Sequence, residues 1–289
     1  MTARLAIFNA YPSEARRDFD KTGVPQAHLL FLDVFRRRFP EASCEVFFPA
    51  DTNEELPSRL EDFDGFLWTG SNGTVYKESP GVKRQLDLVR AMLQLDRPVW
   101  GSCWGLQLAA QASGGEVHAC PAGREWMLAR NVKLNEAGIA HEMFRGKPPV
   151  FSGLVMHLDE VCKTPAGAVV LASNHHSPVQ AMELIVGKCS FWSTQYHPEY
   201  TLLTMAKLMK SRTEALVREG HFPGPEAVVS LADKLIRISD LSISDHGCEE
   251  YEALRIELGL DDSVLNADLK EREIINWIEF RLKPFLSRK

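Results

Sequence analysis

The stretch PVWGSCWGLQ, residues 98–107, decides how this chain is interpreted. Its first five residues form a short apolar run that ends in a small residue, which is typical of a buried strand. Helical spacing follows over Trp104–Ser113 and stops at a Gly-Gly pair. Between strand and helix stands Cys103, with a glycine two residues away on either side. This G-x-C-x-G pattern predicts a sharp elbow that presents Cys103 as a nucleophile, because such a turn tolerates only small neighbours.

The predicted turn also stabilises negative charge near Cys103. A helix that begins at Trp104 directs its positive end at the Cys103 sulfur, which favours the thiolate form. The backbone N–H of Trp104, the residue after the nucleophile, can face a developing oxyanion. The remaining cysteines lack this context and are expected to be small apolar residues; they are Cys44, Cys120, Cys162, Cys189 and Cys248.

A base and its orienting group are found in QYHPEY, residues 195–200. Residues two apart in an extended segment point the same way, so His197 and Glu199 share a face. Pro198 between them has no N–H to donate, which suits the end of a strand. We predict that His197 takes the thiol proton and that Glu199 orients the imidazole ring.

Strands and helices alternate in the first part of the chain. Strands are expected at 4–10, 44–48, 65–69 and 98–102, and helices at 25–39, 82–95 and 104–113. This order predicts an α/β fold with a mainly parallel sheet. Short strand-like runs then follow near 126–134, 150–156, 167–172, 179–185 and 190–196, before a helix at 201–219. They indicate an antiparallel or mixed extension of the same sheet.

A Pro-Gly-Pro break at residues 223–225 marks the expected domain boundary. We divide the chain into a domain over 1–222 and a helical extension over 223–289. The extension shows helical patterns at 226–238, 249–258 and 269–282. Helices this few are hardly stable alone, so their apolar faces are expected to dock on the first domain or on a second copy. No residue of the extension is expected to take part in catalysis.

Composition narrows the classes of function. The chain has 289 residues, 45% hydrophobic and 25% charged, which is typical of a globular protein. A net charge of −6 does not indicate a nucleic-acid-binding surface. The six cysteines form no CxxC pair, which argues against structural zinc and a disulfide framework. No apolar run approaches the roughly 20 residues of a membrane span or the core of a signal peptide. We therefore expect a cytoplasmic protein without membrane contact.

With these motifs in view, the chain resembles the class I glutamine amidotransferases that use a Cys-His-Glu triad. GSCWGLQLAAQASGG and QYHPEY are similar to the two family signatures, and the likeness covers roughly residues 5–215. It is closest to the amidotransferase portions of GMP synthases and their stand-alone relatives. The resemblance implies a flavodoxin-like open sheet with helices on both faces. It also implies that cysteine attacks the side-chain amide of glutamine, ammonia leaves, and water hydrolyses a glutamyl thioester.

Other positions of this sequence are individually similar to functional positions of the family. The loop after the third strand, Thr69–Tyr76, is similar to the family's oxyanion loop, and its N–H donor would come from Gly70 or Ser71. Gln107 matches a glutamine that lies near substrate in the family, although a plain helix glutamine is the alternative.

The histidines outside the triad leave alternatives open. For His157, a place near the catalytic mouth and a structural role are both open. His175 and His176 are adjacent, and neighbours in a strand point oppositely, so they do not chelate easily. We expect no metal and no cofactor.

Three functions remain open. The first is a glutaminase that hands ammonia to a separate synthetase, since the chain has no P-loop or nucleotide signature of its own. The second is a free-standing hydrolase of other γ-glutamyl amides. The third is a silent binding or regulatory protein, disfavoured because every triad position holds a competent residue. An α/β-hydrolase with a cysteine nucleophile is disfavoured because Glu199 follows His197. A homo-oligomer is left open.

Overall fold

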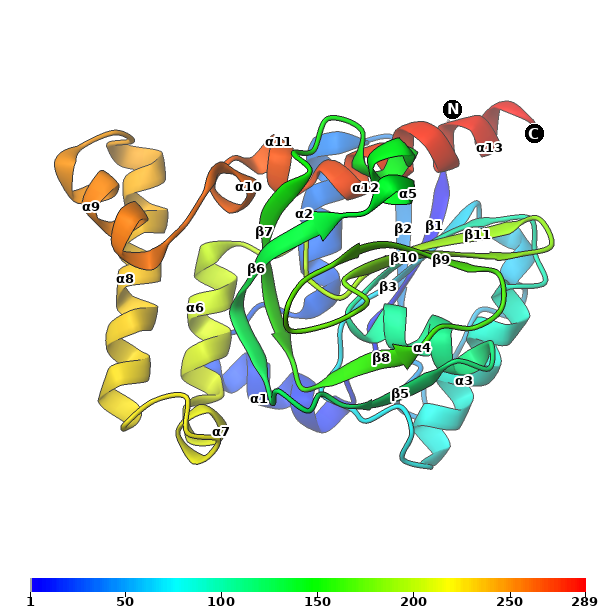
Figure 1. Ribbon diagram of the computed structural model, residues 1–289. Coiled ribbons are helices and arrows are strands. Elements are labelled where there is room, and N and C mark those ends of the chain that lie inside the picture. The colour runs from blue at the N-terminus through cyan, green and yellow to red at the C-terminus, as the bar shows by residue number, and fades with distance from the viewer. Residues whose placement is uncertain (1) are drawn as a thin grey trace.

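The computed structural model describes residues 2–289 and centres on one nine-stranded sheet (Figure 1). The strands follow the order β2-β1-β3-β4-β11-β10-β9-β6-β7. They are β1 (Arg4–Phe8), β2 (Ser43–Phe47), β3 (Gly65–Trp68), β4 (Pro98–Ser102), β6 (Glu125–Leu134), β7 (Val150–His157), β9 (Ala168–Ser173), β10 (Ala181–Val186) and β11 (Cys189–Thr194). The pairings from β2 to β11 are parallel, and those from β11 to β7 are antiparallel. The predicted α/β sheet with its antiparallel extension is confirmed.

Helices cover both faces of the parallel part. They are α1 (Ser13–Thr22), α2 (Ala27–Arg38), α3 (Pro80–Met92), α4 (Trp104–Ala112), α5 (Glu136–Ala140), α6 (Leu202–Ser211) and α7 (Thr213–Arg218), with single turns η1 (Leu60–Asp62) and η2 (Glu142–Phe144). Alternate residues of β1 face opposite sides, as strand geometry requires. Leu5 and Ile7 share a core with α2, whereas Ala6 and Phe8 share a core with α3 and α4. The fold is flavodoxin-like, as expected.

The structure differs from the sequence-based expectation in several elements. Strands β5 (Glu116–Ala119) and β8 (Asp159–Lys163) form a separate two-stranded sheet that was not predicted. Their polar composition hides the apolar pattern by which strands are found. Helix α1 was also missed, since only Ala15 and Phe19 of its ten residues are buried. The single helix expected at 201–219 is two helices, with Arg212 between α6 and α7.

The C-terminal extension packs on the sheet and on α6. Its helices are α8 (Pro225–Ser244), α9 (Glu249–Leu258), α10 (Asp262–Leu265), α11 (Ala267–Lys270), α12 (Arg272–Trp277), the π-helical turn η3 (Ile278–Leu282) and α13 (Lys283–Ser287). Figure 1 shows α8 standing beside α6 and the chain then crossing back to the sheet. Trp277 is fully buried in the core that also holds Leu5 and Trp100. The expected docking on the first domain is confirmed, and truncating one such aromatic typically costs about 3–5 kcal/mol.

None of the helices within residues 2–289 combines the length and apolar character that crossing a bilayer requires.

Candidate active site

Cys103 occupies a strained position between β4 and α4. Its backbone has φ 52° and ψ −96°, a conformation that residues other than glycine rarely adopt. The Cys103 N–H donates to the carbonyl of Thr194 at 2.7 Å, which ties the elbow to β11. A Cβ atom on Gly101 would lie 2.8 Å from the Phe191 ring, and one on Gly105 would lie 2.9 Å from Trp68 Cβ. The glycines of the motif are therefore required by close packing around the turn.

His197 and Glu199 lie together in the segment after β11. The distance from His197 Nδ1 to Glu199 Oε1 is 2.7 Å, and both side chains are 2% exposed. The other carboxylate oxygen of Glu199 accepts a hydrogen bond from Ser102 Oγ at 2.9 Å. The Tyr200 ring stacks on the His197 ring with centroids 3.8 Å apart. The imidazole is thus held by a carboxylate on one edge and an aromatic ring on one face.

The protonation of His197 follows from its neighbours. Burial lowers its pKa, but the attraction of Glu199 and of Cys103 is stronger and raises the pKa to about 9. The ring therefore retains its second proton at neutral pH. An imidazolium beside the sulfur favours a thiolate and can later donate its proton to a leaving amine.

The loop after β3 approaches the same three residues. A Cβ atom on Gly70 would lie 2.7 Å from His197 Cε1 and 3.8 Å from Cys103 Cβ. Within residues 2–289, the N–H groups of Gly70 and Ser71 make no hydrogen bond. The Ser71 hydroxyl donates to the carbonyl of Ala10 at 2.9 Å, which holds the loop against β1. Trp104 is the first residue of α4, so its N–H lies at the free end of that helix. The arrangement is suited to an oxyanion hole.

Cys103 lines a cavity of about 280 Å³. Gln107 also lines it, and its Nε2 donates to the carbonyl of Asp159 at 2.8 Å. That bond fixes the start of β8, so Gln107 shapes the wall of the cavity even before substrate is considered. The Asp159 carboxylate forms part of the same wall and accepts a hydrogen bond from the Tyr76 hydroxyl at 3.2 Å.

Three arginines make the cavity basic: Arg124, Arg212 and Arg218. Arg124 forms a two-pronged ion pair with Glu219, at 2.7 and 2.9 Å. No such side-chain partner is found for Arg212 or Arg218 within residues 2–289. Two guanidinium groups are therefore available to an anionic ligand beside the nucleophile.

His157 combines the two roles that the sequence left open. It lines the cavity, and it is also buried in a polar network. Its Nε2 lies 2.9 Å from Glu125 Oε2 and its Nδ1 lies 3.0 Å from the Asp159 carbonyl. Both ring nitrogens are therefore engaged within the protein. Because the ring has no nitrogen left for a substrate, we assign it to the cavity wall.

Ser102, Asp159 and the three arginines of the cavity were not predicted as site residues. Ser102 could have been noticed because it adjoins the nucleophile. Arg212 and Arg218 belong to a charged stretch that resembles any solvated helix face, and only the break between α6 and α7 turns Arg212 toward the cavity.

A possible set of metal ligands lies elsewhere, on the small sheet. Glu116, His118 and Cys162 bring their ligand atoms within 4.8 Å of one another, and all three are exposed. Lys163 already pairs with Glu116 at 2.7 Å. The cluster contains no triad residue and shows no buried ligand. His176, which was not expected to bind a metal, lies outside this cluster. Its Nε2 is 3.1 Å from the carbonyl oxygen of Gly123.

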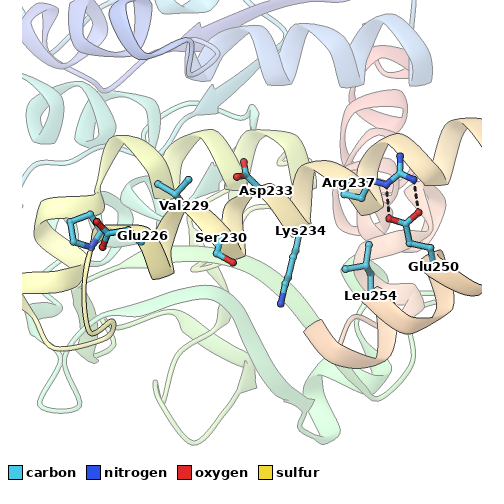
Figure 2. A pocket seen from close by; sticks show the side chains of 9 residues that line it. Glu226, Val229, Ser230, Asp233, Lys234, Arg237, Glu250 and Leu254 are labelled. Atoms are coloured by element: carbon cyan, nitrogen blue, oxygen red, sulfur yellow. Dashed lines mark hydrogen bonds and ion pairs between the residues drawn. The ribbon is translucent and has the colours of Figure 1, made fainter.

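A wider hollow of about 710 Å³ lies between α8 and α9, and none of Cys103, His197 and Glu199 lines it. Figure 2 shows its side chains along the two helices, with Arg237 and Glu250 paired across the gap. Its lining has no buried nucleophile or base, whereas the smaller cavity is lined by the buried Cys103.

Comparison with known proteins relates this chain to one family. The family model described as glutamine amidotransferase class-I matches residues 31–213. A γ-glutamyl-L-1-hydroxyisopropylamide hydrolase from a Pseudomonas species is 32% identical over 290 residues, covering 99% of this chain and 95% of that protein. One subunit of a glutamine-hydrolysing GMP synthase from Sulfolobus acidocaldarius is 29% identical over 150 residues, covering 52% of this chain and 74% of that protein.

A solved structure supports the fold. The crystal structure of a glutamine amidotransferase from Thermotoga maritima superimposes with a TM-score of 0.64, covering 95% of this chain and 99% of that one. At 18% sequence identity, this likeness speaks for the fold alone.

Proposed function

Because this chain belongs to the class-I glutamine amidotransferase family, we propose that it hydrolyses γ-glutamyl amides through a glutamyl thioester on Cys103. The observation that carries the proposal is the buried His197–Glu199 pair beside a cysteine on a strained elbow. The match to a hydrolase over nearly the whole chain, extension included, supports an amine larger than ammonia as the leaving group.

The first half of the reaction forms the thioester. The Cys103 thiolate attacks the amide carbon, and the negative oxygen faces the N–H groups of Trp104 and of Gly70 or Ser71. The C–N bond breaks as His197 gives its proton to the departing nitrogen. An amine leaves, and the glutamyl group stays on sulfur.

The second half restores the enzyme. Neutral His197 takes a proton from water, and the resulting hydroxide attacks the thioester carbonyl. The C–S bond breaks, glutamate leaves, and Cys103 returns as thiolate beside imidazolium. Glu199 holds the ring in place throughout and stabilises its positive charge, since its carboxylate lies 2.7 Å away.

The basic cavity explains why the acyl group would be glutamyl. An α-carboxylate can pair with Arg212 or Arg218, which have no carboxylate partner of their own among the described residues. An α-ammonium group can pair with the Asp159 carboxylate on the same cavity wall. This division of charge fits an amino-acid head group and disfavours a simple fatty amide.

The test compares glutamine, γ-glutamyl alkylamides and 4-aminobutanamide, which is glutamine without its α-carboxylate. We expect the alkylamides to be hydrolysed at least as well as glutamine, and Cys103→Ala to hydrolyse none of them. Arg212→Met should reduce kcat/KM for glutamyl substrates about 10- to 100-fold, because a hydrogen bond to a charged group contributes about 1.5–3 kcal/mol. The variant should not change the poor rate with 4-aminobutanamide. Equal losses on both substrates would remove Arg212 from carboxylate binding.

Transfer of ammonia to a separate synthetase is the second candidate, favoured by the likeness to one subunit of a GMP synthase. Exclusive hydrolysis of glutamine in the same panel would favour it over the broader hydrolase.

A further inference from the structure

A buried lysine of the C-terminal extension holds the backbone on both sides of Glu199. Lys270 Nζ, at the end of α11, donates to the carbonyl of Pro198 at 3.1 Å and to that of Tyr200 at 2.7 Å. Its third donor faces Glu271 Oε1 at 3.3 Å. An ammonium group has three donors, so every one is used. The lysine therefore connects the extension to the segment that carries two members of the triad.

The charge of Lys270 is compensated within the fold. Glu271 is 1% exposed and also accepts from Arg37 at 2.6 Å and Arg38 at 2.9 Å, both on α2. Burial lowers the pKa of Lys270, while Glu271 and Glu199 favour its charged form. Burying an ammonium group is costly unless it is paired and fully hydrogen-bonded. If the extension only covered the sheet, an apolar side chain would be sufficient at position 270. A buried ammonium group at this position therefore indicates a different role.

Two further bonds of the extension reach the same region. Glu273 is fully buried and accepts a hydrogen bond from the Tyr196 hydroxyl at 2.6 Å. Trp277 Nε1 donates to the carbonyl of Val99 at 3.1 Å, in the strand that leads to the nucleophile elbow. The extension is thus bonded to both segments that present the triad.

We propose that Lys270 is a positioning residue of the active site, which fixes Glu199, and through it His197, by holding the carbonyls of Pro198 and Tyr200. The role rests on the proposed function. Lys270 does not line the cavity around Cys103. The extension would therefore influence catalysis by positioning other residues, while direct contact with the reacting atoms stays with the first domain. Released carbonyls would let the segment relax, and a shift of about 1 Å in a reacting group can cost about 10²-fold in rate.

The experiment uses the full chain and two variants. Lys270→Met keeps the length and removes all three donors. Asn276→Leu is the matched control, because Asn276 is another buried side chain of the extension whose Nδ2 donates to two carbonyls, those of Met143 and Arg145, both at 2.9 Å. Two measurements are made: kcat and KM with a γ-glutamyl amide, and the pH dependence of Cys103 alkylation by iodoacetamide.

Lys270→Met is expected to lower kcat about 10- to 100-fold with KM changed less than about twofold. Alkylation near pH 6 should slow as well, because a misplaced Glu199 stabilises the imidazolium less and the thiolate loses its partner. Asn276→Leu should lower thermal stability and change neither measurement. Should Lys270→Met prove insoluble, Lys270→Gln, which has two donors in place of three, should lower kcat and slow alkylation relative to the wild type.

Unchanged kcat and an unchanged alkylation profile in a soluble Lys270 variant would overturn the proposal. Equal effects of Lys270→Met and Asn276→Leu would overturn it also, since they would mean a general loss of stability. Alkylation does not depend on the natural substrate. If the wild-type chain hydrolysed no γ-glutamyl amide, the proposed function would fail while the alkylation profiles still tested Lys270.

Discussion

Adding one methyl group at Gly70 should disable the site without unfolding the protein. In Gly70→Ala the new Cβ would lie 2.7 Å from His197 Cε1, which is closer than carbon atoms approach one another. His197 has little room to retreat, because Glu199 binds its Nδ1 at 2.7 Å and Tyr200 stacks on its face at 3.8 Å. The loop must therefore move, and the N–H groups of Gly70 and Ser71 move with it.

The expected loss follows from the role of that loop. Removing one oxyanion donor typically costs about 10²–10³ in kcat, or about 2.7–4 kcal/mol of transition-state stabilisation. We expect Gly70→Ala to lose kcat in this range while its thermal midpoint stays close to that of the wild type. The assay is steady-state release of glutamate from a γ-glutamyl amide. Gly224→Ala, whose Cβ would meet only the end of the Glu226 side chain at 3.1 Å, is the matched control. Wild-type turnover in Gly70→Ala would refute the oxyanion assignment.

Three further predictions concern the His197–Glu199 pair. Glu199→Gln keeps an acceptor for the His197 ring but loses the negative charge. Because a hydrogen bond to a charged group contributes about 1.5–3 kcal/mol, kcat should fall about 10- to 100-fold. A loss as large as that of Cys103→Ala would mean that Glu199 does more than orient the ring. Because the pKa of His197 is raised to about 9, kcat/KM should decline as pH rises through that value and the ring loses the proton that the leaving amine needs; an alkaline limb near pH 6.5 would contradict this. The same shift makes the stabilising contribution of His197 fully present below about pH 6.5 and lost through about pH 9, so the gap in urea midpoint between wild type and His197→Gln should narrow over that interval.

The fold was predictable where local pattern and tertiary environment agree. The elbow around Cys103 and the strands β1, β3, β4 and β11 have apolar runs that are buried as the pattern implies. Strand β5 has only one buried residue, Val117, so no apolar period marks it.

The break at Arg212 lies between two hydroxyl side chains that bind the helix backbone. Ser211 Oγ donates to the carbonyl of Leu208, and Thr213 Oγ1 donates to that of Lys210, both at 2.8 Å. Serine and threonine also occur within unbroken helices, so the sequence alone does not place the break.

Some residues of the candidate site could likewise be predicted from the sequence, and others could not. Cys103, His197 and Glu199 could be proposed because their chemistry depends on short local spacings. Lys270 could not, because its bonds to Pro198 and Tyr200 join residues about 70 positions apart. Such a contact exists only once the extension has folded back on the sheet.

Acylation of Cys103 by a γ-glutamyl group can be detected by mass spectrometry of the intact protein, after acid quenching during turnover of a γ-glutamyl amide and followed by peptide mapping. We expect one added glutamyl group, located on Cys103, and no adduct in Cys103→Ala. A glutamyl adduct on another cysteine, or full hydrolytic activity in Cys103→Ala, would contradict this expectation.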